Sequence, residues 1–288
     1  VNMALTTHKI ESGLAVTVRL PENQAKVPAI ILCHGFCGIQ ELLLPAFAEA
    51  FVNAGFAAVT FDYRGFGASE GERGRLVPAL QIEDILAVSR WVQTQPQIDS
   101  ERIGLWGTSF GGCHVFGAAA ADPAIKCIVS QLAFADGETI VTGKMTADEK
   151  QAFIATLDKM AEKKQATGKE MFVAVTRVLS DDESKAFFEE NKARYPAMDI
   201  KIPFLTVRET LRYQPRDNAA RVTCPVLVVV AGNDTVNPPE QGIALYEAVG
   251  SAKKALHVEQ NAKHYDMYAG PHFAGIIGRQ IAWFNEHL

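Results

Sequence analysis

The feature that most restricts the fold of this 288-residue chain is a regular alternation of apolar runs with helical patterns. Each run is short and apolar at successive positions, which is typical of strands buried on both faces of a parallel sheet. The runs lie at residues 14–20, 28–34, 57–63, 102–107, 125–131, 225–232 and 253–260. Helical patterns lie at 43–55, 78–95, 110–121, 239–250 and 273–288. This order predicts an α/β fold with a mostly parallel central sheet flanked by helices.

One long segment interrupts the alternation. Residues 136–218 are charged and favour helices, and they contain no convincing buried strand. A segment of this length between two core strands is typical of a lid that covers one edge of a sheet. We therefore predict a core made of residues 1–135 and 219–288, with residues 136–218 inserted as a helical lid or cap.

Charge and composition exclude several classes of partner. The net charge of −5 provides no basic field for a nucleic acid or an anionic membrane, so we expect neither as a partner. The sequence opens without a basic and apolar leader, and no apolar run reaches the roughly 18 residues of a membrane span. We expect a chain without a secretory leader or a membrane span, and the sequence is compatible with a homodimer.

The five cysteines are odd in number and irregularly spaced, which fits a reducing cytoplasm better than a disulfide-bonded scaffold. Three residues, Cys33, His34 and Cys37, are close enough in sequence to suggest metal ligands. No second Cys/His pair at zinc-ligand spacing accompanies them, so we predict no metal site there.

Ser109 stands where an expected strand meets an expected helix, in the sequence Gly107-Thr108-Ser109-Phe110-Gly111. A serine at this junction requires a very sharp turn, and glycines on both sides remove side chains that would collide there. The turn exposes the hydroxyl at the carboxyl edge of the sheet and beside a helix N-terminus, where a developing anion is favoured. The pattern predicts a nucleophile; the alternative is a serine that only caps the helix.

A nucleophilic serine needs a base, and the base needs a carboxylate that orients it. Asp234 directly follows the run at 225–232, and His264 lies in the loop between the run at 253–260 and the last helix. The order nucleophile, acid, base along the chain, each at the end of its own strand, predicts a catalytic triad of Ser109, Asp234 and His264.

Other residues compete for these roles. Asp136, just past the run at 125–131, is a rival acid, and Asp234 could instead form a turn with the Asn-Pro-Pro that follows it. His257 falls inside a strand pattern, where a packed neutral histidine is expected. His272 follows a proline near the last helix and favours a loop-capping role, and His34 favours a structural role at a strand end.

A tetrahedral intermediate also needs backbone N–H groups that face its negative charge. Gly35 lets the chain bend after the run at 28–34, so that the N–H of Phe36 can face the serine. The N–H of Phe110, directly after Ser109, is its expected partner. Cys37 either lines the acyl pocket or fills the core.

With these motifs in place, the chain resembles the α/β-hydrolase superfamily. The resemblance is carried by "HGF" (34–36), "FDYRGFGASEG" (61–71), "GTSFGG" (107–112), "AGNDTVNPP" (231–239) and "KHYDMY" (263–268), and it spans nearly all of the chain outside the lid. Its second motif is similar to those of cocaine-esterase-like and X-prolyl-peptidase-like hydrolases and of esterases related to dienelactone hydrolase. The resemblance implies an α/β-hydrolase fold and the triad and oxyanion roles assigned above. Dienelactone hydrolases themselves use a cysteine nucleophile, which position 109 lacks.

The predicted activity is that of a serine hydrolase, specifically a carboxylic ester hydrolase, which forms an acyl-enzyme on a small-molecule substrate and needs no cofactor. The lid carries more aromatic residues than a solvated helix pair requires, and we expect Phe153, Phe172 and Phe188 to contact the substrate together with Cys37. The alternatives are an acyltransferase with the same triad, a non-catalytic ligand-binding protein of this fold, and a cofactor-free peroxidase.

Overall fold

The computed structural model describes residues 3–22 and 25–288, and its central element is an eight-stranded sheet in the order β1-β2-β4-β3-β5-β6-β9-β10. Neighbours from β4 to β10 are parallel, whereas β2 pairs antiparallel with both β1 and β4. The predicted α/β-hydrolase fold is confirmed. The strands are β1 (Met3–Lys9), β2 (Ala15–Pro21), β3 (Val27–Cys33), β4 (Ala57–Phe61), β5 (Ile98–Thr108), β6 (Ile125–Gln131), β9 (Val226–Ala231) and β10 (Lys254–Glu259).

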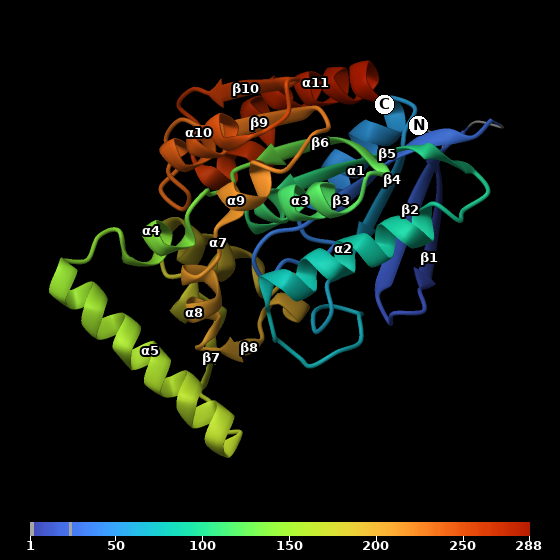
Figure 1. Cartoon of the computed structure of the whole chain (residues 1–288). Coiled ribbons are helices and arrows are strands. Elements are labelled where there is room, and N and C mark those ends of the chain that lie inside the picture. Colours follow the sequence, from blue (N-terminus) through green and yellow to red (C-terminus); the bar gives the residue numbers. More distant parts are fainter. Residues whose placement is uncertain (1–2, 23–24) are drawn as a thin grey trace.

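Helices cover both faces of this sheet (Figure 1). Successive residues of β3 enter different apolar cores, because side chains alternate across a strand. Ile30 and Leu32 pack on one face with α1 and α11, and Ala29 and Ile31 pack on the other with α2, α3 and α10. These helices are α1 (Leu44–Asn53), α2 (Pro78–Val92), α3 (Phe110–Ala121), α10 (Pro239–Ala248) and α11 (Gly270–His287).

The segment predicted as a lid lies to one side of the sheet, and its longest helix, α5, projects away from the rest of the molecule (Figure 1). A small antiparallel pair of strands, β7 and β8, was not predicted; each is three residues long, with Val173 and Ile202 buried. Such short strands give no readable apolar run. The elements are α4 (Gly137–Thr142), α5 (Ala147–Thr167), β7 (Phe172–Ala174), α6 (Val175–Val178), α7 (Asp182–Asn191), η1 (Pro196–Met198), β8 (Lys201–Pro203), α8 (Thr206–Leu211) and α9 (Pro215–Ala219).

The edge strand β1 was also missed. Six of its seven residues are exposed, so it lacks the apolar run that identified the interior strands. Among the described residues, no helix is long and apolar enough to cross a membrane. All five cysteines are free thiols, and every one except Cys224 is buried.

A buried histidine on α3 links three parts of the chain behind the serine. Nδ1 of His114 lies 2.8 Å from the hydroxyl of Tyr213, and Nε2 lies 2.8 Å from Oε1 of Gln81. The ring therefore bridges Gln81 on α2 and Tyr213 before α9, using one nitrogen as a donor and the other as an acceptor. Burial lowers the pKa of His114 to about 3, so the ring stays neutral at ordinary pH.

Replacing His114 with glutamine should make the free energy of unfolding fall less steeply as the pH is lowered. The exposed imidazole of the unfolded chain binds a proton near pH 6.5, which the folded protein does not bind until about pH 3. This residue therefore lowers the free energy of unfolding by about 1.4 kcal/mol per pH unit below about pH 6.5. Urea denaturation between about pH 7 and pH 5 measures it; identical pH slopes in the wild type and the variant would contradict the assignment.

Candidate active site

Ser109 lies at the tip of a tight turn between β5 and α3. Its backbone has φ 56° and ψ −117°, a conformation that a residue with a side chain rarely adopts. A Cβ added to Gly111 would lie 2.0 Å from the carbonyl oxygen of Cys33. A Cβ added to Gly107 would lie 2.3 Å from the carbonyl oxygen of Gly111. The two glycines are therefore required sterically, and the sharp turn expected from the sequence is present.

The predicted acid and base form a buried pair. Oδ2 of Asp234 accepts a hydrogen bond from Nδ1 of His264 at 2.8 Å, and the two residues are only 5% and 1% exposed. The other carboxylate oxygen, Oδ1, accepts from the backbone N–H groups of Val236 and Asn237 at 2.8 and 2.9 Å. These bonds fix the carboxylate, which in turn fixes the imidazole and leaves its Nε2 available for proton transfer.

Ser109 and His264 line one pocket, so the structure brings the three predicted triad residues together. They come from the loops after β5, β9 and β10, at the carboxyl ends of parallel strands. This is the edge at which open α/β sheets hold their ligands. The arrangement can support attack by a serine on a carbonyl carbon, with His264 as base.

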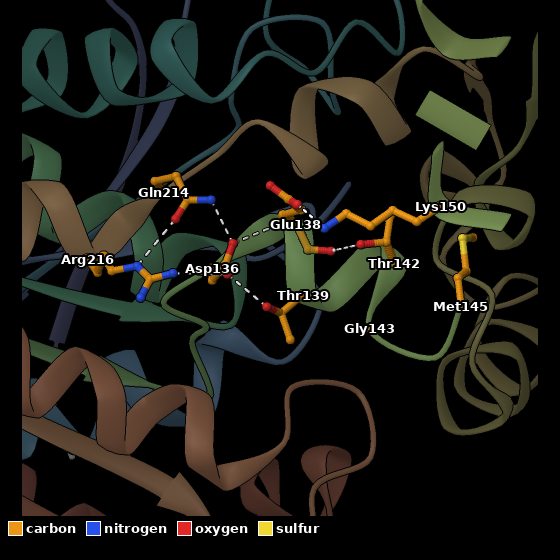
Figure 2. A pocket seen from close by; sticks show the side chains of 9 residues that line it. All are labelled: Asp136, Glu138, Thr139, Thr142, Gly143, Met145, Lys150, Gln214 and Arg216. Carbon is orange, nitrogen blue, oxygen red and sulfur yellow. Dashed lines mark hydrogen bonds and ion pairs between the residues drawn. The ribbon is translucent and has the colours of Figure 1, made fainter. Parts of the chain in front are cut away.

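The rival acid, Asp136, has a structural role elsewhere (Figure 2). It caps α4 by accepting from the backbone N–H of Glu138 at 3.0 Å, and it pairs with Arg216 at 2.9 Å. It also accepts from the amide of Gln214 at 2.6 Å. These groups line a polar hollow of about 430 Å³ on the lid side, which contains neither Ser109 nor His264. No histidine accompanies Asp136 there.

The other histidines considered from the sequence are also engaged away from the serine hydroxyl. His257 and His272 both contact the carboxylate of Glu259, each at 2.9 Å. Nε2 of His34 donates to the carbonyl of Leu42 at 2.7 Å, and burial lowers the pKa of His34 to about 4. The neutral His34 thus ties together the two ends of the loop that contains Phe36.

The loop after β3 runs directly against the serine. A Cβ on Gly35 would lie 3.2 Å from the Cβ of Ser109 and 3.8 Å from the backbone nitrogen of Phe110. In the described part of the chain the N–H of Phe36 has no protein acceptor, and the N–H of Phe110 is the first of α3, where no intrahelical acceptor exists. Phe110 directly follows Ser109, and Phe36 lines the same pocket as Ser109, so both N–H groups without an acceptor lie near this pocket.

The pocket over Ser109 is small and mostly apolar, with a volume of about 40 Å³. Of the four residues predicted to contact substrate, Cys37 and Phe188 line it. The structure does not bring the other two to this pocket: Phe153 packs against the Leu157 cluster between α5 and α8, and Phe172 is 43% exposed on β7. Phe187, another aromatic residue of the segment predicted as a lid, also lines it, and further lining residues that sequence reasoning missed are Leu42, Leu43, Leu179, Tyr265 and Tyr268.

The lid helix α7 contacts the residues next to the acid and the base. The hydroxyl of Ser184 lies 2.8 Å from that of Tyr265, which follows His264, and the ring of Phe187 stacks on Tyr265 with centroids 4.3 Å apart. The carboxylate of Glu183 accepts from the backbone N–H of Thr235, which follows Asp234, at 3.1 Å. The helix that lines one side of the pocket therefore also contacts the loops that carry Asp234 and His264.

A chain of buried side-chain hydrogen bonds joins the serine strand to the base loop. The indole N–H of Trp106 donates to Gln280 at 2.9 Å, Gln280 donates to Gln131 at 2.8 Å, and Gln131 donates to Oγ1 of Thr108 at 3.1 Å. Thr108 then meets the hydroxyl of Tyr268 at 2.5 Å. Because an indole can only donate, the direction of every amide in this chain is fixed.

Replacing Asp234 with asparagine should reduce turnover of an activated ester by about 10⁴-fold, because the amide no longer holds the proton on Nδ1 of His264. Replacing Asp136 with asparagine is the matched control: it should lower thermal stability through the cap and the Arg216 pair, with little effect on turnover. Steady-state kinetics on both variants measures this. The opposite ranking would move the acid to the loop after β6.

Among the described residues, no group of three or more His, Cys, Asp or Glu side chains could hold a metal ion.

Two solved structures share the fold of this chain. One is DcsB in complex with its substrate analogue (TM-score 0.84, 24% identity, 99% of each chain), and the other is the α/β hydrolase GrgF from Penicillium sp. sh18 (TM-score 0.79, 20% identity, 100% of this chain and 99% of that one).

Similar sequences include an Escherichia coli protein described as an uncharacterized 31.7 kDa protein in the traX-finO intergenic region, 63% identical over 99% of this chain and all of that protein. Thiohydrolase aneE of Aspergillus aculeatus is 29% identical over 96% of this chain and 91% of its own length. The quorum-quenching protein AidA of Acinetobacter baumannii is 29% identical over 92% of this chain and 88% of its own length. The family model described as serine aminopeptidase, S33, matches residues 24–267. The chain therefore belongs to this serine hydrolase family of the α/β-hydrolase superfamily.

Proposed function

We propose that the protein is a serine hydrolase that cleaves a carboxylic ester, or a related acyl bond such as a thioester, in a small molecule. The observation that carries the proposal is the strained turn at Ser109 beside a buried pair of Asp234 and His264, with both Ser109 and His264 facing one pocket. Two further observations support it: backbone donors at Phe36 and Phe110, and similarity to a thiohydrolase.

In the proposed reaction, Nε2 of His264 takes the proton of Ser109 as Oγ attacks the substrate carbonyl carbon. The N–H groups of Phe36 and Phe110 stabilise the oxyanion. His264 returns the proton to the leaving oxygen or sulfur, whose bond to carbon breaks and leaves an acyl-serine. His264 then takes a proton from water as its oxygen attacks the acyl carbon, the bond from that carbon to Oγ breaks, and His264 returns the proton to Oγ, which releases the acid and restores Ser109.

The pocket favours a compact and uncharged acyl group. No Asp, Glu, Lys or Arg is among the described residues that line it, so a charged acyl group would lose hydration without finding a partner. The volume of about 40 Å³ limits size, with Phe187 and Phe188 forming the lid side. We further propose the cytoplasm as the compartment, because the buried thiols of Cys33, Cys113 and Cys127 fit a reducing environment.

Wild-type protein should be labelled covalently by a fluorophosphonate, and Ser109→Ala should not be. The same substitution should reduce hydrolysis of short-chain activated esters by about 10⁴- to 10⁶-fold while leaving the unfolding temperature nearly unchanged, since the hydroxyl contributes little to the core. Mass spectrometry of the labelled peptide identifies the site. A variant that keeps a tenth of the wild-type rate would remove Ser109 from the mechanism.

The ester hydrolysis assay also shows whether water or another acceptor receives the acyl group. Acid should form at an unchanged rate when an alcohol or a thiol is added in excess, with little transfer product. Efficient transfer with almost no acid release would make the protein an acyltransferase on the same triad.

Replacing Phe187 with alanine should shift chain-length preference toward longer acyl groups. The substitution opens the lid side of the pocket, and each additional buried methylene contributes about 0.8 kcal/mol of binding. We expect the ratio of kcat/KM for an octanoyl ester to that for an acetyl ester to rise by about tenfold or more. Phe153→Ala is the matched control, since Phe153 packs between α5 and α8 away from the pocket. Equal shifts in both variants would contradict the placement of the acyl group.

A further inference from the structure

Asn237 is a nearly buried residue, 6% exposed, in the loop that carries Asp234. Its side-chain nitrogen donates to the carbonyl oxygen of Leu132 at 2.8 Å and to Oγ of Ser109 at 3.4 Å. Its backbone N–H donates to Oδ1 of Asp234 at 2.9 Å. One residue therefore contacts both the nucleophile and the acid of the proposed triad.

The acceptor at Leu132 fixes which end of the Asn237 amide is the nitrogen and which is the oxygen. A carbonyl oxygen can only accept, so the atom that faces Leu132 must be the nitrogen of Asn237. The same nitrogen is the atom that contacts Oγ of Ser109. Since the amide donates, Oγ of Ser109 is the acceptor, and the contact does not use the hydroxyl proton.

We propose that Asn237 is a positioning residue for the nucleophile, in addition to the triad and the oxyanion donors. Its N–H holds Oγ of Ser109 in place at the pocket that His264 also lines. The contact is long at rest, and a hydrogen bond strengthens when its acceptor gains charge. Negative charge returns to Oγ when the acyl-serine breaks down, so the same N–H also favours that step.

In the sequence, Asn237 is only the first residue of the Asn-Pro-Pro with which Asp234 could form a turn. Asn-Pro-Pro after an acid is typical of a turn, and the backbone N–H groups of residues 236 and 237 do form that turn around Oδ1 of Asp234. The turn uses only the backbone of Asn237. It leaves the amide side chain free to reach across to the loop after β6 and to Ser109, which the chain order does not reveal.

The test rests on the proposed function and compares two variants of the full chain. Asn237→Leu keeps the size of the side chain and removes the donor, while its backbone N–H to Asp234 remains. Gln241→Met is the matched control, because the amide of Gln241 also binds the loop after β6, accepting from the N–H groups of Ala135 and Asp136 at 3.0 Å each. The readouts are the second-order rate of fluorophosphonate labelling across pH and kcat and KM for a short ester.

Asn237→Leu should lower the labelling rate and kcat by about 10- to 100-fold, with KM and the midpoint of the pH profile unchanged. Gln241→Met should stay within about twofold of the wild type. If Asn237→Leu fails to fold, Asn237→Ala replaces it with the same expected loss. Equal losses in the control, or wild-type rates in the folded Asn237 variant, would overturn the proposal.

The pH profile separates this role from an effect through the acid. A shifted midpoint would mean that Asn237 acts on His264 through Asp234, which would also overturn the proposal. Failure of the proposed function has a different signature, since the wild type itself would then not be labelled at Ser109, and both proposals would fall together.

Discussion

The rest of the site depends on the conformation of one residue, because Ser109 keeps a positive φ that its side chain disfavours. The surrounding structure enforces it. The N–H of Ser109 donates to the carbonyl of Gln131 at the end of β6, and the backbone of Gly111 passes against that of Cys33 at the end of β3. Three neighbouring strands thus meet at the turn, and a side chain at position 111 has no space. The energetic cost of the strained turn at Ser109 is therefore offset by the pairing of the sheet. The ends of β3, β5 and β6 must be in place before this turn can form.

Much of this arrangement could be predicted from sequence, for identifiable reasons. Interior strands are apolar on both faces, so β3, β5 and β9 were readable as runs, and each is followed within a few residues by Phe36, Ser109 or Asp234. Parallel topology then brings those loops to one edge. The exposed strand β1 and the three-residue strands β7 and β8 lack such a run, and they were missed.

The pocket was harder to predict than the triad. Aromatic content alone does not say which side of a lid helix faces the core, so Phe153 and Phe172 were expected at the pocket and instead lie on α5 and β7. Tyr265 was missed although it adjoins His264, because its role arises from stacking on Phe187, about eighty residues earlier in the chain. Contacts of this kind depend on tertiary packing and leave no periodic pattern in the sequence.

The contacts of α7 have a consequence for how fast the site can work. The pocket over the serine is small, and Phe187 and Phe188 of α7 form part of its wall, so an outward movement of α7 would enlarge it. That movement separates Phe187 from Tyr265 and Glu183 from Thr235, so it removes support from the residues that adjoin the base and the acid. Widening the pocket in this way would therefore cost contacts that hold the loops of Asp234 and His264. For a substrate that needs the wider pocket, α7 must close again to restore these contacts, and the rate of that closing would set an upper limit on kcat.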